Sequence, residues 1–210
     1  MEKHVAFPVG DLSLEGLLSA TSADCAAVVC HPHPLRGGDM HNNVVGALVG
    51  GLQAAGFSTL RCNFRGVGGS TGMHDDGNSE RDDVRAAVGF LLDQVDCGQV
   101  ALVGYSFGAF VALQAGAADH RVHTMVGVGL PVAARDPSLL RDIAKPTLLI
   151  SGDRDDFSPI SVLLESVGPL SDDLSVVPAP GADHFFFGAE NTLTKPVIDF
   201  LRATSNRSTT

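Results

Sequence analysis

Short runs of apolar residues alternate along this chain with longer segments in which apolar residues recur every three or four positions. A short run is typical of a strand buried on both faces, and the recurring spacing is typical of an amphipathic helix. The expected strands of this kind occupy residues 25–31, 57–64, 100–103, 124–130, 146–151 and 175–177. The expected helices occupy residues 43–55, 79–92, 109–118, 160–167 and 189–203. This alternation predicts an α/β fold, a mostly parallel twisted sheet with helices on both faces.

The two ends of the chain differ from this pattern. In residues 4–18, apolar and polar positions alternate on either side of Val9-Gly10-Asp11, which predicts two short antiparallel strands joined by a turn. Residues 204–210 are polar and are expected to fray. The chain has 210 residues and shows no internal repeat, linker or low-complexity segment, so we expect one domain over residues 1–210.

Composition narrows the class of protein. The net charge of −10 argues against nucleic acid or an anionic membrane surface as a partner. No apolar run is long enough to span a bilayer, and the N-terminus lacks the basic and apolar segments of a signal peptide. The four cysteines, at positions 25, 30, 62 and 97, form no C-x-x-C motif. We therefore expect reduced cysteines in a cytoplasmic protein.

The segment around Ser106 carries the most specific chemical motif. A buried strand is expected to end in Gly104-Tyr-Ser-Phe-Gly108, and a helix of small residues follows. Strand, G-x-S-x-G and helix together form the context of a nucleophile elbow. The sharp turn strains the backbone of Ser106, and glycines on both sides remove side chains that would collide there. The hydroxyl of Ser106 is then exposed beside the free N–H groups of a helix N-terminus, which favour a developing oxyanion.

The last two expected strands end near the residues that a nucleophilic serine needs. They are followed by Asp153, Asp155 and Asp156, and by His184. Parallel sheets bind ligands at the carboxyl ends of their strands, so these side chains are expected to gather there. Serine needs an imidazole to take its proton, and the imidazole needs a carboxylate to orient it. The chain order Ser, Asp, His is the order found in α/β-hydrolases.

Five motifs in this order give the sequence a family resemblance. They are HPHPLRGGDM at 31–40 with NNVV at 42–45, NFRGVGGSTG at 63–72, GYSFG at 104–108, GDRDDFSP at 152–159 and GADHFF at 181–186. The chain resembles the α/β-hydrolases from about residue 25 to 200. Within them it is similar to a small bacterial group without a lid, close to the dienelactone-hydrolase branch. True dienelactone hydrolases carry Cys at the elbow, whereas this chain carries Ser106.

The resemblance implies a role for each site residue. It implies Asp155 as the acid, ahead of Asp153 and Asp156, and His184 as the base. Asp153 lies nearer the strand end, where Asp commonly bonds within a turn. The oxyanion hole is expected to consist of two backbone N–H groups, that of Phe107 and one from the loop after residue 31. Family position suggests His33 for the second, with Leu35 as the alternative, since prolines 32 and 34 have no N–H.

Other patterns in the sequence invite competing interpretations. His31 and His33 form an H-x-H pair, but no third ligand lies at a recognisable spacing, so we expect no metal. The glycines of 66–72 resemble a dinucleotide fingerprint, but Thr71 replaces its third glycine, so we expect no cofactor. Met40 and Phe185 to Phe187 have two interpretations. They either line a pocket for the acyl group of a substrate or belong to the hydrophobic core.

These observations predict a lidless serine hydrolase. The gap from Pro131 to Lys145 is too short for more than one helix, whereas α/β-hydrolases with a lid often insert it there. An open site suits small to medium-sized soluble esters or thioesters, which would form an acyl-enzyme on Ser106. Three alternatives remain open at this point: a peptidase or lactonase with the same triad, a metal-dependent hydrolase, and a non-catalytic binding protein. The expected partner is a small acyl substrate, and a homodimer is possible.

Overall fold

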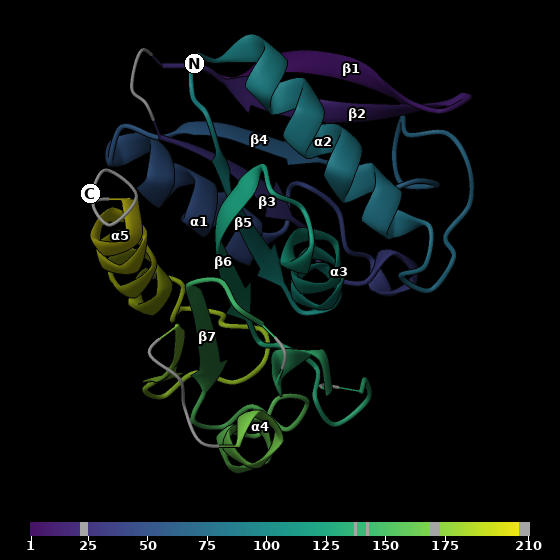
Figure 1. The fold of residues 1–210 in the computed structure, drawn as a ribbon. Helices are drawn as coiled ribbons and strands as arrows, with labels where there is room; N and C mark the ends of the chain where they lie inside the picture. Colours follow the sequence, from purple (N-terminus) through teal and green to yellow (C-terminus); the bar gives the residue numbers. More distant parts are fainter. Residues whose placement is uncertain (22–24, 137, 142, 169–172, 206–210) are drawn as a thin grey trace.

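Eight strands join into one sheet in the part of the chain that the structure describes, residues 1–21, 25–136, 138–141, 143–168 and 173–205 of a computed structural model. The strand order is β1-β2-β4-β3-β5-β6-β7-β8 (Figure 1). The strands from β4 to β8 are β4 (Ser58–Cys62), β3 (Ala26–Cys30), β5 (Val100–Tyr105), β6 (Val122–Val128), β7 (Thr147–Gly152) and β8 (Leu174–Ala179). Neighbours among these six strands are parallel, as the alternating pattern predicts.

The N-terminal strands form the predicted antiparallel hairpin. Strand β1 (Lys3–Val9) pairs with β2 (Leu12–Ser19), and Val9 stands opposite Leu12, so Gly10 and Asp11 form a two-residue loop. Gly10 has φ of 57°, a conformation that such a tight loop requires and that glycine adopts at low cost. Strand β2 is also antiparallel to β4, which attaches the hairpin to the edge of the parallel sheet.

Helices cover both faces of the sheet (Figure 1). Helices α2 (Glu80–Gln94), α3 (Phe107–Ala117) and α4 (Ile160–Val167) contribute to one hydrophobic core, and α1 (Asn43–Ala54) and α5 (Asn191–Ser205) contribute to the other. The side chain of Asn42 caps α1 by accepting a hydrogen bond from the N–H of Val44. The predicted arrangement of an α/β-hydrolase fold, with helices on both faces, is therefore confirmed.

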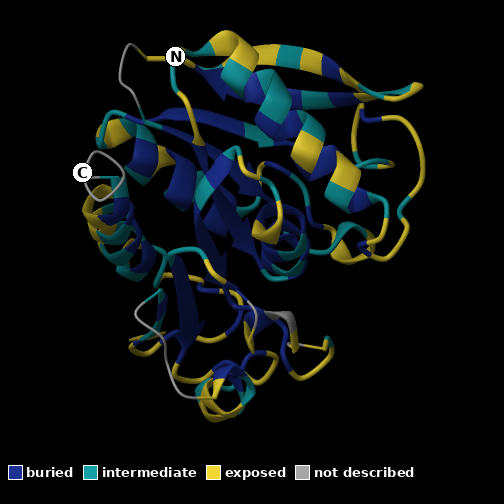
Figure 2. Ribbon diagram, viewed as in Figure 1, coloured by how far each residue is buried: buried dark blue, intermediate teal, exposed yellow. Residues whose placement is uncertain are grey.

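Adjacent residues of the central strands point into opposite cores. Val28 of β3 and Leu102 of β5 lie in the core with α2 and α3, whereas Val29 and Val103 lie in the core with α1 and α5. Because both faces are buried, these strands are continuously apolar instead of alternating. Figure 2 shows the central strands as buried, while the exposed positions lie on the N-terminal hairpin, the loops and the outer faces of the helices.

The register of the sheet brings the strand ends to one edge. Tyr105 at the end of β5 stands opposite Val128 of β6, and Val128 stands opposite Ile150 of β7. On the other side of β5, Gly104 stands opposite Cys30, the last residue of β3. The loops that leave these strands therefore start side by side, and they carry the residues that the sequence singles out.

Most element ends lie within two residues of the predictions, and two of the differences have a clear physical cause. Helix α3 begins at Phe107, two residues before the expected start, because the chain turns from strand into helix directly at Ser106. Helix α5 continues through Ser205, so the predicted fraying from Thr204 onward is wrong at its first two positions. Thr204 is buried, and its hydroxyl bonds to Thr124 and to the carbonyls of Phe200 and Leu201, which anchors the helix end. The rest of the predicted tail, 206–210, lies outside the described residues.

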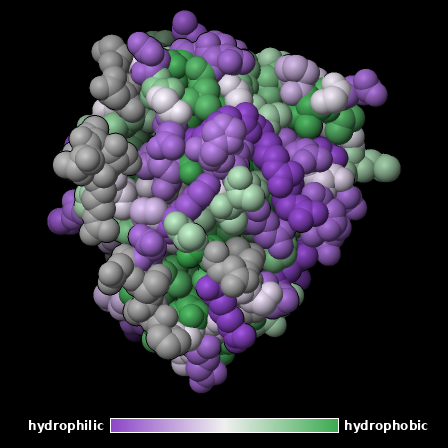
Figure 3. All heavy atoms as spheres, in the orientation of Figure 1, coloured by the Kyte–Doolittle hydropathy of each residue, from purple (hydrophilic) through white to green (hydrophobic). Residues whose placement is uncertain are grey.

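No lid is inserted between β6 and β7 in the described residues of that connection, where a single 3-10 helix (Ser138–Arg141) is formed. The face of the molecule in Figure 3 is mostly hydrophilic, and its hydrophobic residues occur in small separate groups. Among the helices of the described residues, none has both the length and the apolar character needed to cross a bilayer.

Candidate active site

The backbone at Ser106 has the strained geometry of the elbow. Its φ of 55° and ψ of −118° lie outside the regions that residues with a side chain prefer. A side chain on Gly104 would place its Cβ 2.4 Å from the carbonyl oxygen of Gly108, and one on Gly108 would place it 2.4 Å from that of His31. Backbone segments thus approach each other so closely that only glycine fits at these positions. This explains physically the G-x-S-x-G spacing.

Ser106 is hydrogen-bonded to the predicted base. Its Oγ lies 3.0 Å from Nε2 of His184, and Nδ1 of His184 lies 2.8 and 3.0 Å from the two carboxylate oxygens of Asp155. Asp155 is fixed in turn, because its Oδ1 accepts hydrogen bonds of 2.8 Å from the N–H groups of Phe157 and Ser158. The chain of contacts from serine to imidazole to carboxylate has the geometry of a nucleophile, a base and an orienting acid.

The three candidate acids lie in different environments. Asp155 is buried against His184, whereas Asp153 and Asp156 are exposed. Asp153 accepts a hydrogen bond from the N–H of Gly181, which links the loops after β7 and β8. The structure therefore brings Asp155 to the imidazole, whereas Asp153 bonds between two loops and not within its own turn as the sequence suggests.

Two residues that the sequence analysis did not single out support this arrangement. Gly129, at the end of β6, has φ of 56°, and a Cβ there would lie 3.3 Å from Cε1 of His184 and 3.5 Å from Oδ2 of Asp155. Its missing side chain leaves room for the imidazole and the carboxylate. Tyr105 donates a buried hydrogen bond of 2.8 Å from its hydroxyl to the carbonyl of His184, which holds the loop that carries the imidazole. Burial raises the pKa of the Tyr105 phenol well above its usual value, so this group remains a donor.

The backbone N–H groups near Ser106 differ in their availability. Phe107 is the first residue of α3, where N–H groups have no acceptor within the helix. In the described part of the chain, no group accepts a hydrogen bond from the N–H of His33. The N–H of Leu35, in contrast, donates to Nδ1 of His33 at 3.2 Å. His33 and Phe107, which also line the pocket at Ser106, therefore fit an oxyanion hole better than Leu35 does.

His31 is a buried structural residue. Its Nε2 accepts a hydrogen bond of 3.0 Å from the N–H of Phe64, and its Nδ1 donates one of 2.7 Å to the carbonyl of Pro32. These partners fix a neutral imidazole, and burial lowers its pKa to about 4. Since both ring nitrogens bond to protein, the H-x-H pair of His31 and His33 has no free nitrogen at its first member and cannot form a metal site by itself.

A pocket of about 430 Å³ opens above Ser106 and His184. Phe157 and Phe185 line it beside the imidazole, with ring centroids 4.8 and 5.8 Å from that of His184. Of the residues considered for an acyl pocket, Phe185 lines this pocket, whereas Met40 and Phe186 are buried in the interior and do not line it, and Phe187 is exposed.

Another part of the pocket lining, its polar wall, carries polar and charged side chains. His33, Arg36, Asp76 and Arg135 line it, and the guanidinium of Arg135 lies 5.6 Å from the ring centroid of Phe107. Arg135 also donates hydrogen bonds to the carboxylate and to the carbonyl of Asp76. Burial and the nearby positive charges lower the pKa of His33. This wall belongs partly to the long loop between β4 and α2, which the sequence analysis treated only as a tight loop.

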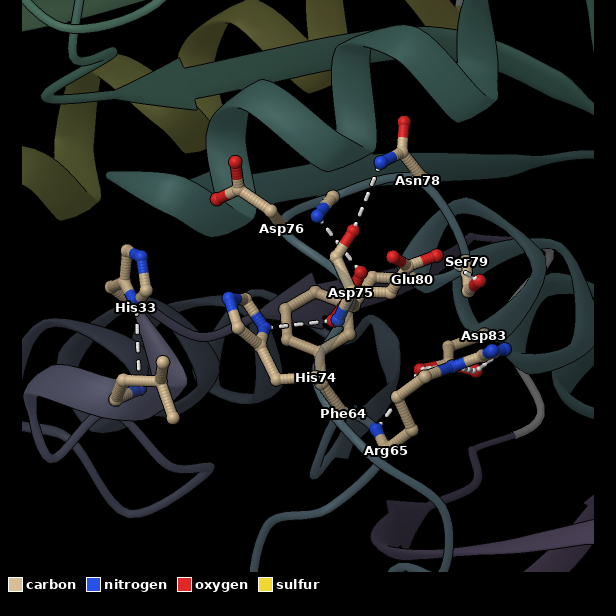
Figure 4. Close-up of polar contacts among 12 residues, drawn as sticks. His33, Phe64, Arg65, His74, Asp75, Asp76, Asn78, Ser79, Glu80 and Asp83 are labelled. Carbon is tan, nitrogen blue, oxygen red and sulfur yellow. Dashed lines mark hydrogen bonds and ion pairs between the residues drawn. The ribbon is translucent and has the colours of Figure 1, made fainter.

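Buried charges hold that loop in place (Figure 4). Asp83 accepts hydrogen bonds from the backbone N–H, Nε and Nη2 of Arg65. Glu80 accepts hydrogen bonds from the N–H groups of Asp75 and Gly77, and its Oε1 lies 2.8 Å from Nδ1 of His74. Both acids are buried, so each needs these partners. Arg65 and Asp83 are 18 residues apart, and no local sequence signal links them.

Comparison with known proteins agrees with this geometry. The family model of the α/β hydrolase fold matches residues 36–138. The structure of an α/β serine hydrolase homologue from Coxiella burnetii superposes with a TM-score of 0.83, at 32% identity, over 95% of this chain and 96% of that one. This chain belongs to the α/β-hydrolase family.

Two further proteins are similar to this chain over most of their length. An α/β serine hydrolase without a lid from Xanthomonas campestris has a TM-score of 0.84, with 30% identity, over 96% of this chain and 94% of that one. An uncharacterized protein of Rickettsia prowazekii is 34% identical over 184 residues, which cover 83% of this chain and 77% of the relative. The likeness to a lidless member agrees with the short connection between β6 and β7.

Proposed function

We propose that this protein is a serine hydrolase that cleaves carboxylic esters or thioesters of small to medium-sized soluble substrates. The observation that carries the proposal is the chain of contacts from Ser106 through His184 to Asp155 at the base of an open pocket. Relatives from Coxiella burnetii and Xanthomonas campestris that share about a third of its sequence are described as serine hydrolases, which supports the same chemistry here.

The proposed reaction has two steps. Oγ of Ser106 attacks the carbonyl carbon of the substrate while Nε2 of His184 takes the hydroxyl proton, and the carboxylate of Asp155 stabilises the imidazolium. The N–H groups of His33 and Phe107 stabilise the oxyanion. The bond to the alcohol or thiol then breaks as the leaving group receives the proton from His184. Water, activated by the same imidazole, hydrolyses the acyl-enzyme and restores Ser106.

The pocket supports the proposed substrate size. Its volume of about 430 Å³ is within the usual range for sites that bind small molecules, and the described residues of the β6–β7 connection place no lid over it. Ser106 stands where dienelactone hydrolases carry Cys, so we place the protein near that branch but propose ester chemistry instead of dienelactone hydrolysis.

Labelling with a fluorophosphonate probe followed by intact-mass spectrometry tests this proposal. We expect one adduct on the wild-type protein, none on Ser106→Ala, and an unchanged adduct on Ser138→Ala, which alters an exposed serine. A folded wild-type protein without an adduct would contradict an activated serine and favour a non-catalytic binding protein.

Kinetics on a panel of esters, thioesters, lactones and peptides then defines the class of substrate. We expect kcat to fall on the order of 10⁶-fold for Ser106→Ala or His184→Ala and on the order of 10⁴-fold for Asp155→Asn. Full activity of Asp155→Asn would show that another carboxylate is the acid. Preferential cleavage of lactones or peptides would replace the proposed ester or thioester substrates with one of those classes.

A further inference from the structure

Three potential metal ligands converge at the edge of the pocket, on its polar wall. His33, His74 and Asp76 each offer one ligand atom, and these atoms all lie within 4.8 Å of one another. Figure 4 shows the two imidazoles and the carboxylate turned toward a common space. His33 follows β3, whereas the other two residues belong to the loop between β4 and α2, so the fold joins ligands that are about 40 residues apart in the chain.

His74 lies against a buried carboxylate. Its Nδ1 is 2.8 Å from Oε1 of Glu80, which accepts two hydrogen bonds from the N–H groups of Asp75 and Gly77. Nδ1 is buried and forms no hydrogen bond of normal geometry, but a carboxylate beside one ring nitrogen is the usual neighbour of a metal-ligating histidine, whose other nitrogen holds the metal. In Figure 4 that second nitrogen faces the space shared with His33 and Asp76.

The donor set selects the kind of ion. Two imidazole nitrogens and one carboxylate oxygen suit zinc and similar divalent transition metals, whereas magnesium and calcium prefer oxygen ligands alone. Ligands of a tetrahedral zinc ion are about 3.3 Å apart at the usual bond lengths, so these side chains need only small rotations to close around one. The side chain of Asp76 is exposed, so it can rotate toward the two imidazoles.

Two existing contacts compete with an ion, and neither prevents its binding. Nδ1 of His33 now accepts the N–H of Leu35 at 3.2 Å, so ligation through Nε2 requires the other tautomer. Leu35 is exposed, and water can accept its N–H instead. Arg135 donates to one carboxylate oxygen of Asp76, which leaves the second oxygen available.

We propose that His33, His74 and Asp76 bind a divalent ion of the zinc class, and that the bound ion obstructs the pocket. His33 and Asp76 line the same pocket as Ser106, so an ion between them stands in the path of a substrate. Three protein ligands leave a fourth coordination position open, which a substrate anion or water can take. The binding of the ion is independent of the proposed function, whereas its inhibitory effect rests on the proposed hydrolase activity.

Metal titration of the full-length protein without a polyhistidine tag tests the site. With Zn²⁺ in calorimetry and Co²⁺ in visible spectroscopy, we expect one ion per chain and d–d bands typical of a four-coordinate site. His74→Gln and Asp76→Asn are expected to weaken binding about tenfold or more. His120→Gln, which changes an exposed histidine elsewhere, is expected to leave it unchanged. Unchanged affinity in both ligand variants, or no binding by the wild-type protein at millimolar metal, would overturn the proposal.

Two further variants sharpen the test. Arg135→Gln removes a positive charge and a competitor for Asp76, so we expect tighter Zn²⁺ binding; equal or weaker binding would argue against Asp76 as a ligand. If the protein hydrolyses esters, Zn²⁺ is expected to inhibit the wild-type protein and to inhibit Asp76→Asn about tenfold less strongly. Inhibition that is equally strong in Asp76→Asn and His74→Gln would place the ion elsewhere. If no ester is cleaved, the proposed function fails and the titration alone decides the site.

Discussion

The nucleophile elbow and the loop at 63–79 border the same pocket, but different forces hold them in place. The elbow contains no charged residue. Its shape depends on backbone segments that lie so close to Gly104 and Gly108 that a single Cβ at either position would collide with them. The loop depends on buried carboxylates, each with several donors, such as Asp83 with Arg65.

The difference separates a steric constraint from an electrostatic one. A collision between backbone atoms cannot be relieved by a side-chain rotation, so the elbow tolerates no added atom. A buried carboxylate that loses one hydrogen-bond partner keeps its others. Substitutions in the loop therefore reduce its stability by degrees, and that stability depends on the protonation state of the carboxylates. The steric part positions Ser106, and the electrostatic part positions the polar wall that faces it.

The largest effect is expected at the elbow, from Gly108→Ala. The new Cβ would lie 2.4 Å from the carbonyl oxygen of His31 and 2.5 Å from that of Cys30. We expect the free energy of unfolding to fall by about 5 kcal/mol or more, at the upper end for a single substitution, or soluble expression to fail. Urea denaturation followed by circular dichroism measures this loss.

The matched control is Gly50→Ala in α1, where a Cβ would meet no atom within 4 Å. Alanine is the better helix former there, and we expect a gain of about 0.5–1 kcal/mol. If the free energy of unfolding of Gly108→Ala lies within about 1 kcal/mol of the wild-type value, the close backbone approach does not determine the shape of the elbow.

An intermediate effect is expected in the loop, from Asp83→Asn. The buried carboxylate accepts three hydrogen bonds from Arg65, and the substitution leaves a guanidinium without its counter-charge. We expect a loss of about 3 kcal/mol in the free energy of unfolding. Asp82→Asn, at the neighbouring exposed position on α2, changes the same chemical group and should cost less than about 0.5 kcal/mol. Equal losses in the two variants would show that burial of the pair is unimportant.

The smallest effect is expected at His31, which joins the two regions, and it depends on pH. Burial lowers the pKa of His31 in the folded protein to about 4, against 6.5 for the unfolded chain, so the folded protein holds this imidazole neutral. The hydrogen bond to the carbonyl of Pro32 and the charge of Asp39 oppose this shift only partly. The contribution of the neutral His31 to the free energy of unfolding is therefore fully present above pH 6.5. It is lost as the pH falls toward 4, because in this range only the unfolded chain takes up the proton.

Comparison of unfolding free energies at pH 7 and pH 5 measures this term. The wild type should lose about 2 kcal/mol more between these pH values than His31→Gln, whose side chain does not titrate. Since other groups titrate in both proteins, the difference between the two losses isolates His31. Equal losses would mean that His31 titrates normally in the folded protein.

Much of the fold was predictable because its signals are local. Continuous apolar runs gave the buried strands, and the residues at their carboxyl ends indicated Ser106, Asp155 and His184 as candidates before the structure placed them in contact. The elbow was predictable for the same reason, since its glycines act on backbone within a few residues. The start of α3 and the end of α5 were missed because a strained turn and a buried threonine override local propensity.

The polar wall of the pocket and the contacts that hold the loop at 63–79 could not be predicted. Arg135 and Asp76 are 59 residues apart, Arg65 and Asp83 are 18 residues apart, and no periodicity marks such pairs. Likewise, His33 meets His74 only because the loops after β3 and β4 leave neighbouring strands at the same edge of the sheet.

The sequence by itself determined the order of strands and helices, the elbow and the candidates for the triad, because each depends on backbone preferences and burial periodicity over short distances. The tertiary structure alone decided which of three aspartates reaches His184, which N–H groups remain free at the pocket, and which charges are paired beside it. Those outcomes depend on distances and burial between segments far apart in the chain, which arise only when the sheet has formed.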